Sequence, residues 1–477
     1  MTKLVIALDN LSIDEAKDRV MKIQESNKDS QIIFKVNDLL ALVGYNGLFS
    51  IFQNSKAFLM LDTKYNDIGN TLKNYLKKLA DSQIKDKTCI LTVHASVGKE
   101  ALTSLANYKK ELGLKELKIF AITALTSLDE EANMTIFGKP SKENVLNLAQ
   151  VAYESGIDGI VCSANEVAMI KEIFGRNILT LTPGIRFDKQ DKQDQKRVAT
   201  IDEAVKNGSD YIVMGRPILN APDMQEAINK ALELINSNHY EPTNKYSFEK
   251  LLLTGTWEDI LKQIGVIYER KENGKFCRIA SGLLTNVYIN IAVLERYPLI
   301  LKKISLELRK KLIEKNIFNP EFSHDYVVMG AQMGSVRISS HLGEALGLSG
   351  TSIYTEKSGD DNKEMALKRH LIDLKGKKII LSEDIVTKGT TLRRMTKFIK
   401  ELEGVVVGIT CVGNRTGKYE FEGIPLLSCI IPPEFEYYYD EKTPQEAREN
   451  YPQLPENAQI CEKPKASWTE LTRNLLS

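Results

Sequence analysis

The sequence predicts an α/β protein of two domains, the first of which is a parallel (β/α)8 barrel. Over roughly the first 235 residues, short apolar segments alternate with amphipathic stretches, which is typical of parallel strands joined by helices. The chain has 477 residues, whereas a single hydrophobic core usually stops growing at roughly 250 to 300 residues. A second domain is therefore expected. In that second half, an apolar strand runs into a glycine turn and a helix near residue 389.

Eight short apolar segments are the expected barrel strands. Amphipathic segments such as Ile13–Glu25 and Asn144–Ser155 are the expected helices between them. In chain order the strands are Leu4–Leu8, Ile32–Val36, Phe58–Leu61, Ile90–Val93, Ile119–Ala124, Gly159–Cys162, Ile178–Leu181 and Tyr211–Met214. Active sites of such barrels lie at the carboxyl ends of the strands. At these ends the sequence carries Asp9, Lys35, Asp62, Lys64, Asp67, His94, Ser96, Ser127, Thr182-Pro183-Gly184 and Gly215-Arg216-Pro217.

The hexapeptide Asp62-Thr63-Lys64-Tyr65-Asn66-Asp67 places one lysine among carboxylates at a strand end. A spacing of two along a strand points Asp62 and Lys64 to the same side. An imperfectly paired buried charge destabilises a protein by several kcal/mol, so this group of charges is not explained by a contribution to stability. We interpret Lys64 as a proton donor that is held in an active site. The alternative, from the hexapeptide alone, is a solvated triad at the surface.

The segment Met214–Pro217 suits a phosphate group. Gly215 allows the backbone to approach the anion, and Arg216 supplies a bidentate fork. Phosphate sites after the last strands are common in barrels. The polar stretch 188–197 is interpreted as a loop that closes over this phosphate, with a plain solvated loop as the alternative.

The first half of the chain resembles the orotidine 5′-monophosphate decarboxylase family. The matching segments are Ala7-Leu8-Asp9, Phe34-Lys35-Val36, Leu61–Thr71 and Val213–Pro217. The resemblance implies that Lys64 donates a proton to pyrimidine C6 as carbon dioxide leaves, within a charged network completed by Lys35, Asp62 and Asp67. It implies no metal and no organic cofactor for this half.

The same resemblance assigns the substrate contacts. It implies Asp9 and Lys35 at the ribose hydroxyls, Asp67 and Thr71 at the partner subunit's site, Ser127 at the pyrimidine, Pro183 in the substrate pocket, and Gln195, Gly215 and Arg216 at the phosphate. Two positions depart from the family pattern, because Asn37 and Gly69 stand where glycine and proline are common. A related group that decarboxylates sugar phosphates usually carries an acidic metal ligand in place of Lys35, so this lysine favours the nucleotide enzyme.

The polar composition of residues 236–245 indicates a linker after the last barrel helix. We therefore predict a barrel over residues 1–237, a linker over 238–247 and a second domain over 248–477. Within that domain, residues 379–391 form an apolar strand that passes through Glu383 and Asp384 into a small-residue turn, and a helix is expected over Leu392–Leu402. Such a turn makes a phosphate cradle, because unpaired backbone N–H groups converge on an anion. A glycine turn taken alone is more often structural than a phosphate site, so the prediction depends on the full pattern of residues 379–391.

The full pattern resembles the type I phosphoribosyltransferase family, and the surrounding order resembles its orotate phosphoribosyltransferases. The supporting segments are Ala280-Ser281-Gly282, Tyr288-Ile289-Asn290, Val327–Gly334 and Gly413–Gly417, so the resemblance covers about residues 250–420. It implies a parallel sheet flanked by helices, with Glu383 and Asp384 at the ribose of phosphoribosyl diphosphate (PRPP) and Arg415 at orotate. The residues implied at the 5′-phosphate are Thr387, Lys388, Gly389, Thr390 and Thr391.

The stretch from Tyr354 to His370 departs from the family's catalytic loop. Its polar, glycine-containing composition predicts a lid whose cations screen the leaving diphosphate. The candidate lid residues are Lys357, Lys363, Lys368, Arg369 and His370, and Lys357 is also expected to contact PRPP. The alternative for each of them, with equal weight, is a charged side chain exposed to solvent. Because the lid is altered, a PRPP-binding sensor module or a transferase for another base remains the alternative. Magnesium (Mg²⁺) is expected with PRPP, with no direct side-chain ligand.

Together the two resemblances imply that the second half converts orotate and PRPP to orotidine 5′-monophosphate (OMP), which the first half decarboxylates to UMP. A net charge of +1 argues against nucleic acid as a partner. The 6 cysteines contain no C-x-x-C pair, so reduced thiols and no zinc site are expected. With no signal peptide or membrane span expected, we predict a cytoplasmic protein. Both families usually form homodimers, so a homodimer or a larger homo-oligomer is expected.

Overall fold

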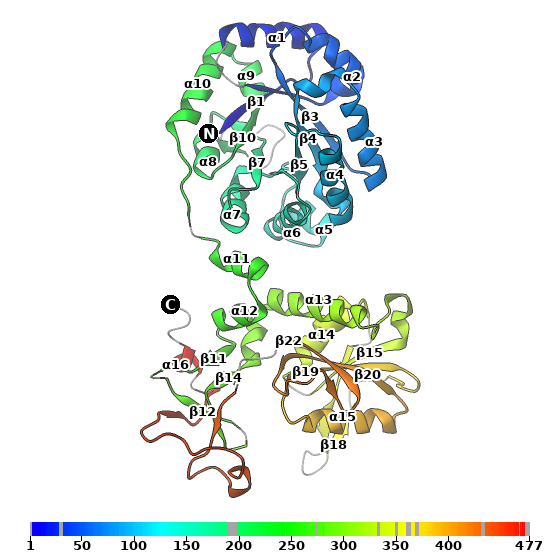
Figure 1. Cartoon of the computed structure of the whole chain (residues 1–477), viewed down its shortest axis with the longest axis vertical. Helices are drawn as coiled ribbons and strands as arrows, with labels where there is room; N and C mark the ends of the chain where they lie inside the picture. Colours follow the sequence, from blue (N-terminus) through cyan, green and yellow to red (C-terminus); the bar gives the residue numbers. More distant parts are fainter. Residues whose placement is uncertain are drawn as a thin grey trace. The chain divides into compact units, whose positions relative to one another are not determined.

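The computed structural model describes most of the chain as two compact units, residues 1–253 and 254–477 (Figure 1). The described residues are 2–27, 32–188, 198–243, 245–272, 274–279, 281–331, 334–348, 352–358, 364–367, 372–430, 435–466 and 468–472. In this part of the chain, no helix is long and apolar enough to cross a membrane.

The first unit is a closed barrel of parallel strands in the order β1-β10-β7-β6-β5-β4-β3-β2. The strands are β1 (Lys3–Ala7), β2 (Ile33–Val36), β3 (Phe58–Tyr65), β4 (Thr88–His94), β5 (Lys118–Ile122), β6 (Gly159–Val161), β7 (Leu179–Thr182) and β10 (Tyr211–Met214). All eight expected strands are confirmed, and the main difference is that β3 continues through the charged hexapeptide to Tyr65. The fold class predicted for this half is therefore correct.

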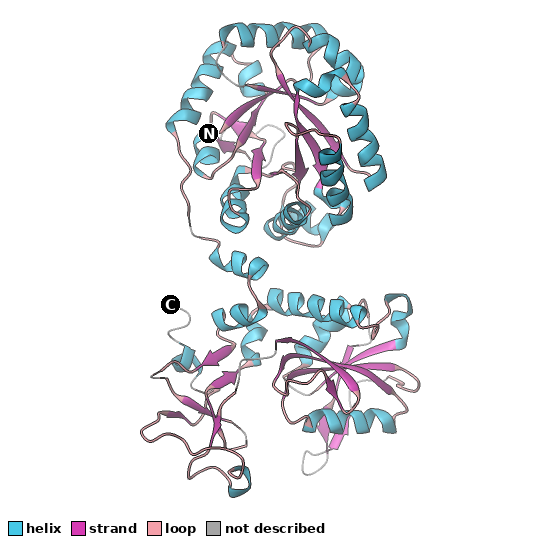
Figure 2. Ribbon diagram, in the orientation of Figure 1, coloured by secondary structure: helices cyan, strands magenta, loops and turns pink. Residues whose placement is uncertain are grey.

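Helices surround the strands of this unit (Figure 2). They are α1 (Ile13–Ser26), α2 (Asp38–Phe52), α3 (Gly69–Ala80), α4 (Lys99–Glu111), α5 (Glu130–Phe137), α6 (Ser141–Glu154), α7 (Ala164–Phe174), α8 (Ile201–Lys206), α9 (Arg216–Leu219) and α10 (Met224–Ser237), with 3-10 turns η1 (Gln83–Lys87) and η2 (Ala95–Val97). A capping box of Ser12 and Glu15 begins α1, because each side chain satisfies a backbone N–H of the other. A short parallel ladder joins β8 (Ile185–Arg186) to β9 (Ala199–Thr200).

The inside of the barrel is filled by apolar side chains from the strands, including Val5, Met60 and Phe120. Gly159 in β6 pairs with Phe120 in β5 and leaves space for its ring. A Cβ at position 159 would lie 2.3 Å from a ring carbon of Phe120, far inside van der Waals contact. The glycine is therefore required by packing.

We expect Gly159→Ala to destabilise the barrel by about 1–3 kcal/mol, because the added methyl overpacks a filled core. Unfolding followed by far-UV circular dichroism reports this loss. Both tryptophans, Trp257 and Trp468, lie in the second unit, so unfolding followed by tryptophan fluorescence is the control and should not change. Phe120→Leu in the same chain should relieve part of the effect, and purely additive losses would contradict the packing argument.

The segment between α10 and α11 (Ser247–Thr254) contacts the barrel unit. The Glu172 carboxylate accepts hydrogen bonds from the backbone N–H groups of Thr243 at 3.0 Å and Tyr246 at 2.8 Å. The expected linker, 238–247, therefore includes residues that are attached to the barrel, and the two units meet in sequence within α11, at residue 253.

The second unit is built on a six-stranded sheet in the order β16-β15-β19-β20-β22-β21. Its strands are β15 (Tyr326–Gly330), β16 (Ser352–Tyr354), β19 (Lys378–Val386), β20 (Val405–Asn414), β21 (Glu420–Phe421) and β22 (Ile424–Ile430), parallel except for the edge strand β21. Helices α13 (Pro298–Glu314) and α14 (Val336–Ala345) cover one face, and α15 (Thr390–Glu401) covers the other (Figure 1). This is the parallel sheet with flanking helices that the resemblance implied.

A smaller part of this unit joins the segment before the sheet to the end of the chain. Strand β13 (Leu284–Thr285) pairs with β23 (Tyr437–Tyr438), and β12 (Phe276–Arg278) pairs with β24 (Ile460–Cys461). The remaining elements are α12 (Trp257–Gln263), β11 (Ile267–Glu269), β14 (Val287–Ile289), η3 (Ile291–Arg296), η4 (Pro320–Asp325), β17 (Glu356–Ser358), β18 (Glu364–Ala366), η5 (Gln445–Ala447) and α16 (Trp468–Thr472). The C-terminal segment is thus part of the second unit.

Candidate functional site

Four charged side chains meet at the carboxyl ends of β1, β2 and β3. The Nζ atom of Lys35 lies 2.7 Å from both carboxylate oxygens of Asp9 and 3.3 Å from Oδ2 of Asp62. The Nζ atom of Lys64 lies 2.5 Å from the same Oδ2. Lys35 and Asp62 are each only 7% exposed, whereas Lys64 is exposed at the rim. Of the predicted network, Lys35, Asp62 and Lys64 are therefore brought together, joined by Asp9, whereas Asp67 contacts Ile68 and Tyr75 instead.

The backbone around Lys64 is bent away from regular strand geometry. Lys64 has φ of +46°, a left-handed conformation that is uncommon outside glycine and concentrates at functional sites. The ladder between β3 and β4 is irregular between Leu61 and Tyr65. Asp62 and Lys64 therefore meet through this bend as well as through the alternation of a strand.

Thr92 and Asn37 hold this bend in place. The hydroxyl of Thr92 donates to Oδ1 of Asp62 at 3.0 Å and accepts from the backbone N–H of Lys64 at 2.9 Å. Asn37 Nδ2 donates to the carbonyl oxygen of Asp62 at 2.5 Å. The departure from the family pattern at position 37 thus supplies a contact to the cluster. Sequence reasoning missed Thr92, because a threonine within an apolar strand gives no signal of its own.

Electrostatics within the cluster favour an ionised Asp62. Burial acts to raise the pKa of Asp62, but the ammonium groups of Lys35 and Lys64 outweigh it, so this pKa lies below its usual value. Nearby, burial and then the charge of Lys64 lower the pKa of His94. The imidazole is therefore neutral near pH 7, and it adds no positive charge to the site.

A cavity of about 530 Å³ opens over this cluster. Of the residues predicted for the first site, seven line it: Asp9, Lys35, Asp62, Lys64, Pro183, Gly215 and Arg216. Asp67 and Thr71 do not, and the exposed Ser127 lies beside the cavity-lining Thr126. Gln195 lies outside the described residues.

Two further features shape this cavity. The added Cβ of a residue at position 215 would lie 3.3 Å from Cβ of Ala7, so Gly215 keeps the backbone close to β1. Arg186, which is 4% exposed, also lines the cavity and donates from Nη1 to the carbonyl oxygen of Ile185 at 3.0 Å. Sequence reasoning stopped at Gly184, although a cation two residues beyond that glycine was a usable signal.

In the second unit, adjacent carboxylates lie near the carboxyl end of β19. Asp384 accepts a hydrogen bond from the backbone N–H of Ile385 at 2.7 Å, while Oε2 of Glu383 is buried without a partner in the described part of the chain. Burial, followed by the charge of Asp384, raises the pKa of Glu383 to about 8. Burial also raises the pKa of Asp384, against lowering contributions from the Ile385 amide and Lys465. Such a pair is suited to a cationic or hydroxyl-bearing ligand.

The turn that follows β19 contains a left-handed glycine at the start of α15. Gly389 has φ of +70°, and a Cβ there would lie 2.0 Å from the ring of Phe421. The chain then enters α15 at Thr390. Thr387, Lys388 and Thr390 are exposed and Thr391 is partly exposed, so the turn residues are accessible to a phosphate.

Arg415 follows β20, directly beside this turn, where its backbone N–H donates to the carbonyl oxygen of Val386 at 2.9 Å. Its guanidinium lies 3.8 Å from the centroid of the Phe435 ring and donates a hydrogen bond to the hydroxyl of Tyr437. Burial lowers the pKa of Arg415 from its ordinary value. The structure thus brings the three predicted parts, namely the acidic pair, the turn and the arginine, to one edge of the sheet.

The predicted transferase lid is only partly described. Lys357 lies in β17, where it pairs with Met365 of β18. Lys363, Lys368, Arg369 and His370 lie outside the described residues. Within the described part of the chain, no group of three or more His, Cys, Asp or Glu side chains is placed to hold a metal ion.

Comparison with known proteins assigns both halves to families. Residues 2–231 match the orotidine 5′-phosphate decarboxylase / HUMPS family, and residues 300–436 match the phosphoribosyl transferase domain. The orotidine 5′-phosphate decarboxylase of Helicobacter pylori strain P12 is 37% identical over 243 residues, which cover 48% of this chain and 99% of that protein. The Campylobacter fetus enzyme is 36% identical over 231 residues, or 98% of its length.

Two solved structures are also similar. Orotidine 5′-phosphate decarboxylase from Lactobacillus acidophilus is 31% identical, with a TM-score of 0.42, over 50% of this chain and 100% of that chain. Leishmania donovani UMP synthase is 17% identical, with a TM-score of 0.39, over 90% of each chain. From the sequence matches, the chain belongs in its first half to the orotidine 5′-phosphate decarboxylase family, and this decarboxylase domain is fused to a C-terminal phosphoribosyltransferase domain.

Proposed function

We propose that the protein carries out the last two steps of UMP synthesis, orotate transfer in the second unit and OMP decarboxylation in the first. The observation that carries the decarboxylase assignment is the cluster of Asp9, Lys35, Asp62 and Lys64, which lines one cavity at the carboxyl ends of the strands. For the transferase, the support is the acidic pair at 383 and 384 beside the Gly389 turn and Arg415.

In the decarboxylation, the substrate phosphate lies against the Gly215 backbone and the Arg216 and Arg186 cations, with Gln195 as a further contact. Its pyrimidine lies over Lys64. Loss of carbon dioxide leaves an electron pair on C6, which the Lys64 ammonium stabilises and then protonates. Asp62, kept ionised by both lysines, holds the ammonium in place before the reaction.

In the transfer, the Thr387–Thr391 turn receives the 5′-phosphate, and Glu383 and Asp384 accept hydrogen bonds from the ribose hydroxyls. A ring nitrogen of orotate forms the bond to the anomeric carbon as diphosphate departs, and Arg415 pairs with the orotate carboxylate. Mg²⁺ held mainly by PRPP oxygens would offset the charge of the leaving group. The unpartnered Oε2 of Glu383 fits a place beside such a complex.

The barrel is proposed to form a homodimer. The carboxylate of Asp67 accepts a hydrogen bond from the backbone N–H of Ile68, and Asp67 does not line the cavity of its own chain. The side chain of Ile68 is 71% exposed, so this surface beside Asp67 is accessible to a second copy. In that arrangement Asp67 and Thr71 reach the partner's active site.

Incubation of the full chain with carboxyl-labelled orotate, PRPP and magnesium tests the proposal. Release of labelled carbon dioxide together with UMP is expected. Decarboxylation of added OMP without use of orotate would instead indicate a sensor module or a transferase for another base. No decarboxylation of OMP would contradict the role given to Lys64.

The raised pKa of Glu383 predicts that binding of the magnesium–PRPP complex strengthens with pH. Below about pH 8 the free protein holds this proton, which must be released before the carboxylate can contact a cation. Affinity should therefore rise between pH 6 and about 8 and then level off. Calorimetric titration in buffers of different ionisation enthalpy measures the proton release. Glu383→Gln should abolish it, and an equal release by this variant would assign the proton to another group.

A further inference from the structure

The Arg415 guanidinium is partly buried against the C-terminal segment, and its buried Nε has no acceptor in the described part of the chain. Its side chain donates a hydrogen bond to Tyr437. A guanidinium carries five N–H donors. An arginine in this state is suited to the oxygen atoms of an incoming carboxylate, because burial strengthens such a pair and leaves the unmatched donors costly.

Two aromatic side chains fix the plane and position of this guanidinium. Phe435 contacts its face at 3.8 Å from ring centroid to guanidinium carbon. Tyr437, whose ring lies nearly parallel to that of Phe435 at an interplanar angle of 16°, accepts its hydrogen bond. Tyr451 packs on Tyr437 with the ring centroids 5.5 Å apart. The face contact and the hydrogen bond together restrict both the position and the rotation of the arginine.

The segment that contains these aromatic residues is paired with the β12–β13 hairpin of the same unit. Strand β23, which contains Tyr437, pairs with β13, and the backbone N–H of Glu436 donates to Asn286 at 2.9 Å. The segment therefore adds a strand beside the hairpin that includes Ser281 and Gly282.

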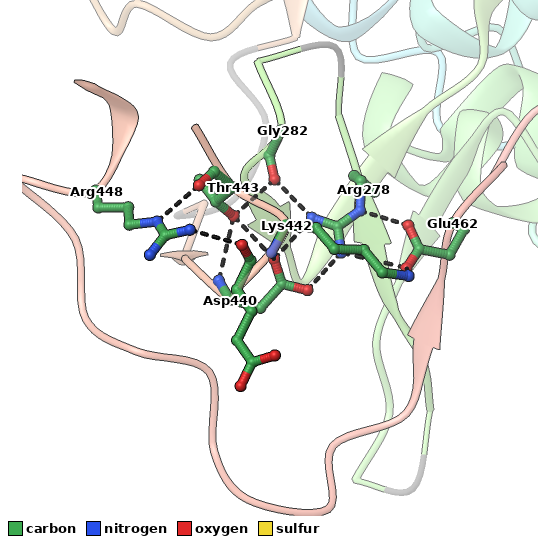
Figure 3. A network of polar contacts seen from close by, with 8 residues as sticks. Arg278, Gly282, Asp440, Lys442, Thr443, Arg448 and Glu462 are labelled. Atoms are coloured by element: carbon green, nitrogen blue, oxygen red, sulfur yellow. Dashed lines mark hydrogen bonds and ion pairs between the residues drawn. The ribbon is translucent and has the colours of Figure 1, made fainter. Parts of the chain in front are cut away.

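An ion-pair network locks the following loop in place (Figure 3). Arg278, whose side chain is 13% exposed, binds Asp440 at 2.5 Å and Glu462 at 2.5 Å. Hydrogen bonds from Arg278 are the main cause that lowers the pKa of Asp440 and brings that of Glu462 to about 2. Thr443 donates to the carbonyl oxygen of Gly282 at 2.9 Å. These contacts join residues more than 160 positions apart in the sequence, and they attach the C-terminal segment to the β12–β13 hairpin.

We propose that Tyr437 and Phe435 are positioning residues that hold the Arg415 guanidinium toward the carboxylate of the acceptor base, so that the C-terminal segment 435–466 determines base selection in the transferase. This inference rests on the proposed orotate transfer. It assigns the segment a role in the recognition of a carboxylated pyrimidine. Without the segment, the Arg415 side chain could adopt several rotamers and would bind the carboxylate less tightly than the fixed guanidinium does.

Tyr437→Phe in the full chain tests the role of the hydroxyl. The KM for orotate is expected to rise about tenfold, whereas the KM for PRPP and kcat stay within about twofold, because only the base contact loses its orientation. Tyr438→Phe is the matched control, since the neighbouring hydroxyl donates to Glu436 at 3.0 Å and does not contact Arg415. That control should leave all three parameters unchanged.

Phe435 supplies a second test. Phe435→Tyr keeps the aromatic face and should preserve the KM for orotate, whereas Phe435→Leu should raise it about five- to tenfold. If Tyr437→Phe raises the KM for PRPP and for orotate alike, the segment is merely structural and the inference is wrong. If the wild type transfers to orotate and Tyr437→Phe equals Tyr438→Phe, only the inference fails. A wild type that does not use orotate would overturn the proposed function and the inference together.

Discussion

Lys64→Ala is expected to lower kcat/KM for the decarboxylation of OMP by about 10⁴-fold or more, the largest effect of any single change in the barrel. The variant removes the proposed proton donor for C6, which is also the ammonium proposed to stabilise the developing charge. It also leaves Lys35 as the remaining cation beside Asp62, so the carboxylate faces the substrate without the ammonium that lies 2.5 Å from it in the native site. Release of labelled carbon dioxide from OMP measures the loss.

Lys64→Arg separates the two roles of this side chain. Arginine keeps the positive charge but does not release its proton near neutral pH, so this variant should also be nearly inactive if proton donation is required. Lys99→Ala, which removes an exposed lysine that is paired with Glu154, should stay within about twofold of the native rate. Transferase activity of the same molecule controls for the amount of intact protein, and far-UV circular dichroism controls for folding of the barrel. Retention of a tenth of the native decarboxylation by Lys64→Ala would exclude it as the proton donor.

The sequence predicted the barrel strands because apolar runs with helical segments between them leave few other folds. It also predicted Asp62 and Lys64 as neighbours, since both lie at one strand end. The support beneath them could not be found in this way. Thr92 is separated from Asp62 by about one βα unit, and its contact depends on the irregular ladder between β3 and β4. The left-handed backbone at Lys64 likewise follows from tertiary contacts and from no local propensity.

The same limit applies to the second site. The strand, acidic pair and glycine turn are contiguous, so their positions follow from the sequence of one segment. Phe435 and Tyr437 belong to a stretch to which no role could be given from sequence, because their contact with Arg415 requires β23 to pair with β13. Ser127 and Thr126 illustrate a smaller limit: both are polar and adjacent, and only the structure shows that Thr126 lines the cavity.

Asp384→Asn is expected to lower kcat/KM for orotate transfer about 10²-fold or more while decarboxylation of added OMP stays within about twofold. The side chains have the same shape, so the close approach of Gly334, whose added Cβ would lie 2.2 Å from Oδ2 of Asp384, is preserved. What is lost is the charge that we propose accepts hydrogen bonds from the ribose and faces the magnesium–PRPP complex. Asp373→Asn, at an exposed carboxylate of the same unit, is the control and should change neither reaction.

The pH dependence of the Asp384→Asn variant gives a second, independent result. In the native protein, burial and then the charge of Asp384 raise the pKa of Glu383 to about 8. Removing that charge leaves burial as the cause, so the pKa of Glu383 should fall, and the rise in PRPP affinity with pH should move to lower pH. An unchanged pH profile would mean that the two acids do not interact. Loss of both enzymatic activities in a folded protein would contradict separate sites, because a carboxylate of the second unit would then be required for chemistry in the first.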